Sequence, residues 1–201
     1  MTSIKTTLKR KQAQQEILQA ALPYIESGKY NQLSIREFCH EIGVTTGMFY
    51  RYYKTKSDLL AFYAIDTSKL LFDSLKDNFP TMSLREKLVS FCMASIKPLQ
   101  TMGPESLFVF LNVKNPECNC DVSRQLFYDQ IRYVFDSTYD GHQYAEEDLL
   151  DISNQLVILE KGIVYEWYSR QDDPTFELMP VAEHCFDKAL DAYSFLNDEK
   201  S

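Results

Sequence analysis

Apolar residues recur at every third or fourth position along most of the chain, which is the spacing of one face of an α-helix. Between residues 9 and 27 this face consists of Ile17, Leu18, Ala21, Leu22 and Ile25. No segment alternates apolar and polar residues for long enough to indicate a β-strand. The pattern therefore predicts an all-α protein.

Glycine and capping residues mark where the predicted helices begin and end. Gly28 and Gly43 each follow an apolar segment, at a place where glycine commonly terminates a helix. Ser34-x-x-Glu37 is a capping box, in which the hydroxyl and the carboxylate bind free N–H groups at a helix start. Helices are expected over residues 9–27, 34–42, 45–52, 55–78, 83–97, 104–114, 121–138, 146–170 and 176–196.

Polar helix starts and a proline break shape the middle of the chain. Thr45 is expected to cap the third helix, and Thr55 with Asp58 forms a weaker capping box for the fourth. A further capping box at Ser83 begins the fifth helix. We expect that helix to stop or bend at Pro98, because proline lacks an N–H group and clashes with the preceding turn.

Two short helices joined by a turn that contains glycine, over residues 34–52, form the pattern of a helix-turn-helix. In that motif the second helix enters the major groove of DNA, and its first residues touch the base edges. Thr45 and Thr46 would offer hydroxyl groups there, and Gly47 would let the backbone approach closely. The alternative is an ordinary corner between two helices, whose aromatic residues serve only the core.

The distribution of charge separates the beginning of the chain from the remainder. The 201 residues carry a net charge of −8. Residues 1–60 hold nine Lys and Arg against five Asp and Glu, a net charge of +4, so the other 12 basic and 24 acidic residues leave −12. A basic first part on an acidic body is expected when only one end of a protein meets DNA.

Several other classes of function lack the residues that they need. No Ser/His/Asp, Cys/His or Glu-x-x-His arrangement has a usable spacing, so we expect no enzyme. Cys118-x-Cys120 has no second pair at zinc-site spacing, so we expect neither a metal nor a cofactor, and a redox role for this pair stays open. No run of about 18 apolar residues and no signal peptide occurs, which predicts a cytoplasmic protein with no membrane partner.

The order of residues between positions 9 and 65 resembles the DNA-binding signature of the TetR family of bacterial transcriptional regulators. Phe38-Cys39 and Tyr52-Tyr53 depart from the family's usual residues, Ile/Leu-Ala and His-Phe, but they keep the bulk of those side chains. The matching positions are Ile17-Leu18, Ala20-Ala21, Glu26-x-Gly28, Leu33-Ser34-Ile35, Ile42-Gly43-Val44, Gly47-x-x-Tyr50, Tyr53 and Lys56-x-x-Leu59-Leu60.

This resemblance implies a set of contacts with double-stranded DNA. Arg36 matches a position that reads a base in some relatives, and its planar guanidinium group suits guanine. Tyr50 and Lys56 match phosphate contacts, which position a protein without specifying a sequence. The complete set of implied DNA-binding residues is Ser34, Arg36, Thr45, Thr46, Gly47, Met48, Tyr50, Arg51 and Lys56.

The resemblance also implies two domains and a dimer. Residues 1–56 would form a three-helix helix-turn-helix domain, and residues 57–201 a larger helical domain for effector binding and dimerisation. The last two helices would form a four-helix bundle in a homodimer on a near-palindromic operator. Residues 146–170 carry an apolar stripe broad enough for a partner as well as the core.

Family members commonly bind a small-molecule effector among their middle helices. The leading hypothesis is therefore a ligand-responsive homodimeric repressor; the alternative is an activator or adaptor whose C-terminal domain binds a protein partner. The sequence leaves open the operator, the effector and the regulated genes. Aromatic residues that would line an effector pocket, and would equally suit a core, are Phe91, Phe108, Phe110, Phe127, Tyr128 and Phe135.

Overall fold

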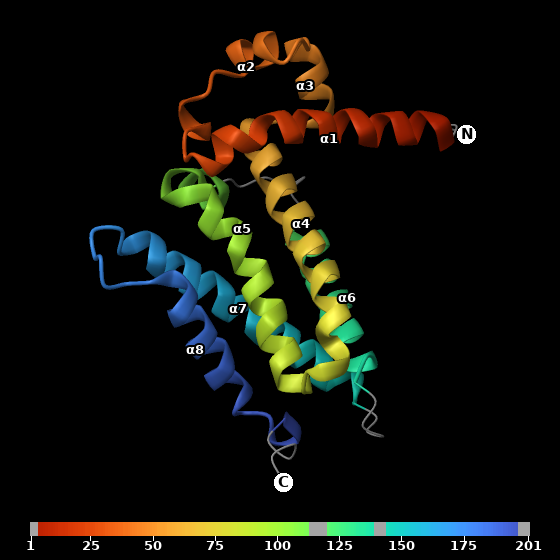
Figure 1. Cartoon of the computed structure of the whole chain (residues 1–201), viewed down its shortest axis with the longest axis vertical. Helices are drawn as coiled ribbons and strands as arrows, with labels where there is room; N and C mark the ends of the chain where they lie inside the picture. The colour runs from red at the N-terminus through yellow and green to blue at the C-terminus, as the bar shows by residue number, and fades with distance from the viewer. Residues whose placement is uncertain (1–3, 113–119, 139–143, 197–201) are drawn as a thin grey trace. The chain divides into compact units, whose positions relative to one another are not determined.

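The computed structural model describes residues 4–112, 120–138 and 144–196, and their regular elements are all helical (Figure 1). The all-α prediction is confirmed. The elements are α1 (Ile4–Glu26), η1 (Tyr30–Gln32), α2 (Ile35–Glu41), α3 (Thr46–Tyr52), α4 (Lys56–Leu75), η2 (Lys76–Thr81), α5 (Leu84–Asn112), α6 (Cys120–Asp136), α7 (Glu146–Ser169), α8 (Leu178–Leu190) and η3 (Ser194–Leu196).

The chain divides into two compact units. The first unit comprises Met1–Ala64 and Thr101–Lys114, and the second comprises Ile65–Gln100 and Asn115–Ser201. Two of the three boundaries fall inside helices, one within α4 and the other within α5, and the third lies outside the described residues. The expected boundary between functional domains, after residue 56, stays a prediction.

Aromatic rings hold the first unit together around the corner of α2 and α3. Phe38 of α2 and Phe49 of α3 are completely buried and meet edge to face, with ring centres 6.4 Å apart. Tyr53, at the end of α3, packs its ring 5.5 Å from that of Phe49 and donates a hydrogen bond to the main-chain oxygen of Gln14 in α1. These contacts fix the two short helices, which bury too little of their own surface to be stable alone.

The glycine ends of the first two helices are confirmed. Gly28 and Gly43 have φ values of 70° and 71°, in the left-handed region that favours glycine. Beyond Gly28, the Lys29 N–H donates to the Tyr24 carbonyl, and beyond Gly43, the Val44 N–H donates to the Cys39 carbonyl, both at 2.9 Å. This six-residue hydrogen bond closes a helix and turns the chain away from its axis.

The break in α5 lies at Gly103 rather than at Pro98, so the expected break at Pro98 is wrong. The helix continues through Pro98, and Gly103 alone has non-helical angles, φ 73° and ψ 165°. Pro104 explains the position of the kink, because a proline ring disfavours the helical conformation of the residue before it. A helical segment then begins at Pro104, as predicted, since the first turn of a helix tolerates proline.

The second unit is a set of packed helices in which α7 lies against both α6 and α8 (Figure 1). Its last helix is shorter than the predicted range of 176–196. Before α8, Asp173 accepts hydrogen bonds from the N–H and the hydroxyl of Thr175, and this local turn competes with helix. After Leu190, short-range bonds such as Tyr193 N–H to Leu190 carbonyl, at 3.1 Å, replace the α-helical pattern.

Candidate nucleic-acid interface

The start of α2 presents two of the predicted DNA-binding residues to solvent. Ser34 is the N-cap of this helix, and its hydroxyl oxygen accepts a hydrogen bond from the N–H of Glu37 at 3.5 Å. Arg36 lies in the first turn, and its side chain is exposed. The guanidinium group is therefore on the outside of the fold, where it is available to a partner.

The sequence of α3 divides the helix into an anchored side and an exposed side. The Thr45 hydroxyl oxygen accepts a hydrogen bond from the N–H of Met48 at 3.1 Å, which caps the helix as predicted. Phe49 anchors the inner side. The exposed residues at the start and on the outer side of α3 are Thr45, Thr46, Gly47, Tyr50 and Arg51, and Met48 is half-buried.

Packing within the protein does not explain the glycine at position 47. Its φ is not in the left-handed region, and a Cβ atom built there would meet only the Thr45 hydroxyl, at an ordinary contact distance of 3.9 Å. A glycine also costs an exposed helix about 0.5–1 kcal/mol relative to alanine. The residue therefore fits a surface that another molecule approaches closely.

Lys56 differs from the other predicted DNA-binding residues because its ammonium group is engaged inside the protein. The Nζ atom donates to the main-chain oxygens of Asn31 and Leu33, each at 2.7 Å. The Tyr30 hydroxyl donates to the main-chain oxygen of Lys56 at 2.9 Å. Sequence reasoning missed Tyr30, because its partners lie more than 20 positions away and no local pattern indicates them.

Among the predicted effector residues whose side chains the structure describes, the three phenylalanines are buried. Phe91 and Phe127 are buried against each other, with ring centres 4.5 Å apart. Phe135 is also buried, but its ring lies among those of Tyr144 and Phe195, at 4.7 and 6.3 Å.

Of the three other predicted effector residues, Tyr128 alone has a side chain in the described part of the chain. Tyr128 is half-buried and donates its hydroxyl proton to Glu146. The side chains of Phe108 and Phe110 lie outside the described part of the chain.

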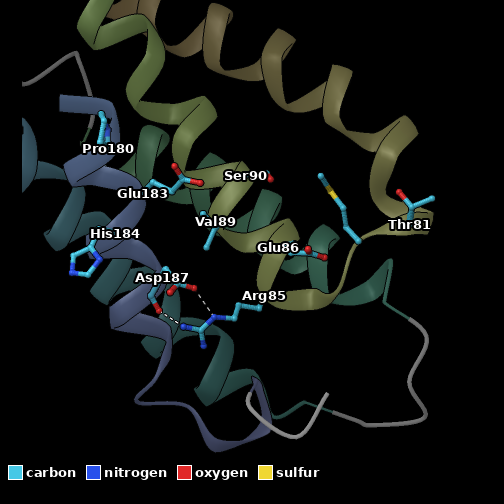
Figure 2. A pocket seen from close by; sticks show the side chains of 10 residues that line it. Thr81, Arg85, Glu86, Val89, Ser90, Pro180, Glu183, His184 and Asp187 are labelled. Carbon is cyan, nitrogen blue, oxygen red and sulfur yellow. Dashed lines mark hydrogen bonds and ion pairs between the residues drawn. The ribbon is translucent and has the colours of Figure 1, made fainter. Parts of the chain in front are cut away.

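An open groove of about 610 Å³ lies in the second unit, between the start of α5 and α8 (Figure 2). Figure 2 shows Arg85 reaching from α5 toward Asp187 of α8, and their ion pair measures 2.7 Å. None of the predicted effector residues whose side chains are described lines this groove. Its lining residues are Thr81, Met82, Arg85, Glu86, Val89, Ser90, Pro180, Glu183, His184 and Asp187.

The described residues offer no metal centre, since no three His, Cys, Asp or Glu side chains among them are placed to hold an ion. Cys118 and the side chain of Cys120 lie outside the described part of the chain. Among the described helices, none is long and apolar enough to cross a membrane.

The candidate interface lies in a segment that matches a known protein family. Residues 17–61 match the model of the bacterial regulatory proteins of the tetR family. This segment contains α2, α3 and the start of α4, and therefore the whole exposed face described above. No protein of curated function matches the chain.

Solved structures share the fold at low sequence identity. A transcriptional regulator FadR from Bacillus subtilis, in complex with stearoyl-CoA, is 16% identical with a TM-score of 0.59, over 86% of this chain and 95% of that one. A tetR-family transcriptional regulator from Streptomyces coelicolor is 20% identical with a TM-score of 0.58, over 94% and 85%. The TetR-family regulator PfmR from Thermus thermophilus is 15% identical with a TM-score of 0.51, over 85% and 94%.

Proposed function

We propose that this chain, whose residues 17–61 match the model of the tetR family, is a TetR-family transcriptional regulator that acts as a ligand-responsive homodimeric repressor on a near-palindromic operator. Residues 1–56 serve as the DNA-binding domain. Residues 57–201 serve effector binding and dimerisation.

The exposed side of α3 is the observation that carries this proposal. Thr46, Gly47, Tyr50 and Arg51 make one solvent-facing surface, while Phe49 on the opposite side is completely buried. A helix held in this way inserts its outer residues into the major groove without rearranging the fold. Arg36, also exposed, supplies a planar donor group that suits guanine O6 and N7.

An apolar stripe on α7 supports a dimer. Leu150, Ile158 and Tyr165 are 52%, 66% and 63% exposed, although large apolar side chains usually lie inside. They are separated by eight and seven residues, so they share one side of the helix. A second copy of the chain that covers this stripe would bring two copies of α3 to one operator.

The effector site is proposed for the second unit, and a small-molecule effector is supported by the similar FadR structure, which is a complex with stearoyl-CoA. The rings of Phe91 in α5 and Phe127 in α6 pack against each other. An apolar ligand between these helices would have to displace them, so Phe91→Ala should change the affinity for it. The second candidate function is an activator or adaptor whose C-terminal domain binds a protein.

Binding-site selection from random double-stranded DNA, with the full-length chain, tests the proposal. We expect an enriched inverted repeat, and Arg36→Ala should lose about 1–3 kcal/mol of discrimination at one or two positions in each half. Arg132→Ala, which removes an exposed arginine of α6, is the matched control and should leave the preference unchanged. Failure of the wild-type chain to enrich any sequence would contradict the proposed function.

A further inference from the structure

A reciprocal set of contacts joins the loop before α2 to the start of α4. The ammonium group of Lys56 donates to the carbonyl oxygens of Asn31 and Leu33, at 2.7 Å each, and lies 5.1 Å from the centre of the Tyr30 ring. The hydroxyl of Tyr30, which is completely buried, donates in return to the carbonyl oxygen of Lys56. We name these contacts among Tyr30, Asn31, Leu33 and Lys56 the Lys56 clamp.

The clamp occupies most of the hydrogen-bond donors with which a lysine could bind a phosphate. A lysine ammonium has three N–H donors, and two of them are bound to main-chain oxygens here. Burial lowers the pKa of Lys56, which means that the charged group has already lost part of its water shell. To bind a phosphate fully, the side chain would have to release two hydrogen bonds of the charge-assisted kind, which are stronger than neutral ones.

The N-terminus of α4 is also occupied by the protein itself. The Asp58 carboxylate accepts a hydrogen bond from the Thr55 N–H at 2.8 Å, and the Thr55 hydroxyl oxygen accepts one from the Asp58 N–H at 3.2 Å. Free N–H groups and the positive end of the helix dipole are what draw an anion to a helix start. Here the Asp58 carboxylate already lies at this helix start, and its negative charge opposes a second anion.

We propose that Lys56 is a positioning residue of the DNA-binding face, and that it does not itself bind a phosphate. Leu33 directly precedes Ser34, the N-cap of α2, so the clamp fixes the first turn of α2 that carries Arg36. Loss of the clamp would let this turn shift relative to α3 and would misplace the guanidinium group. The inference rests on the proposed DNA-binding function.

The salt dependence of DNA binding separates this role from that of a phosphate ligand. Each phosphate contact contributes about −0.9 to the slope of log K against log salt concentration. We expect full-length Lys56→Met to bind the selected operator about tenfold more weakly at every salt concentration, a loss of about 1.4 kcal/mol, with an unchanged slope. Lys54→Met is the matched control, because it removes the same charge from an exposed side chain two residues earlier.

Sequence preference supplies a readout that a merely structural role would not change. Binding-site selection with folded Lys56→Met should relax the same base positions as Arg36→Ala, because the first turn of α2 is displaced. Tyr30→Phe keeps every charge and removes one bond of the clamp. It should relax the same positions without changing the slope, and it replaces Lys56→Met if that variant does not fold.

Two results would overturn the inference. A slope that becomes shallower by about 0.9 in Lys56→Met would make this lysine a phosphate ligand. An unchanged sequence preference in both Lys56→Met and Tyr30→Phe would remove the link to Arg36. If instead the wild-type chain selects no sequence, the proposed function fails first, and the role of the clamp fails with it.

Discussion

Glu160 is an acidic residue on α7 whose carboxylate faces the interior of the second unit. Burial raises the pKa of its carboxyl group from 4.5 to about 7, while a hydrogen bond from Ser95 and the charge of Lys161 oppose the rise. The folded chain therefore prefers the protonated acid, whereas the unfolded chain ionises near pH 4.5. Folding becomes less favourable as the pH rises between these two values.

Glu160→Gln should remove this pH dependence. Glutamine keeps the shape of the protonated acid, so we expect the variant to be more stable than the wild type by about 1–3 kcal/mol at pH 8 and equal to it near pH 4.5. Urea unfolding at a series of pH values measures the difference. Glu147→Gln, at an exposed position of the same helix, is the control and should follow the wild type. Parallel profiles for wild type and Glu160→Gln would contradict the prediction.

The direction of the Lys56 side chain is the part of the candidate site that the sequence did not provide. Arg36, Thr46 and Tyr50 were predicted to face a partner, and they are exposed. The helical period places the buried rings on the inner faces of α2 and α3, so these three residues lie on the outer faces. Lys56 was predicted to face a phosphate on the strength of a family resemblance. Its direction depends on carbonyl groups 23 and 25 positions earlier, which no local pattern records.

At the scale of elements, helix starts followed from the sequence because capping is local. Ser83 donates its main-chain N–H to the Glu86 carboxylate at 2.8 Å, as its spacing predicted. The kink in α5 required a choice between two prolines six positions apart, Pro98 and Pro104. Pro98 removes an N–H group from the helix but leaves its path unbroken. Pro104 follows Gly103, which adopts left-handed angles at little cost in free energy, so the helix kinks there.

Arg85 connects the first turn of α5 to the end of α8. Its side chain is 13% exposed, and its guanidinium group forms ion pairs of 2.7 Å with both Asp187 and Asp191. Its hydrogen bonds lower the pKa of both carboxyl groups. Because the folded-state pKa values are lowered, the stabilisation is present above the ordinary carboxyl pKa and is lost as the pH falls through the folded values.

Arg85→Met should destabilise the protein by about 1–3 kcal/mol at pH 7, and the difference from wild type should shrink in acid. Arg132→Met is the control, since the ion pair of Arg132 with Glu146 is solvent-exposed at 3.1 Å and should contribute at most about 0.5 kcal/mol. Thermal unfolding at pH 7 and pH 3 measures both. Equal losses of stability for the two variants would show that the ion pairs of Arg85 stabilise the fold no more than an exposed ion pair does.

At the scale of the whole molecule, the apolar stripe on α7 predicts where two copies of the chain meet in a dimer. Ile158 has the largest exposed fraction in that stripe, 66%, so it should lie near the centre of a dimer contact. A charge buried there without a partner is strongly unfavourable. Ile158→Glu should therefore separate the dimer without unfolding the chain.

Sedimentation at micromolar concentration measures this effect. The wild type should sediment at twice the chain mass of 23.4 kDa, and Ile158→Glu should sediment at the chain mass and lose cooperative binding to the operator. Leu70→Glu is the matched control, because Leu70 is 61% exposed on α4, outside the proposed contact, and its substitution should leave the dimer intact. A wild-type chain that sediments at 23.4 kDa would contradict the dimer.

The division of α3 into anchored and exposed sides has an evolutionary consequence. Phe49 and Tyr53 hold the helix through rings that are 0% and 1% exposed, while Thr46, Tyr50 and Arg51 face outward. Exposed substitutions usually change stability by no more than about 0.5 kcal/mol. After a gene duplication, one copy can therefore accumulate changes on the outer side of α3 while the fold is preserved, and under the proposed function such changes would give it new target promoters. Sequence changes that alter what the outer side of α3 binds are therefore separate from sequence changes that alter the stability of the fold.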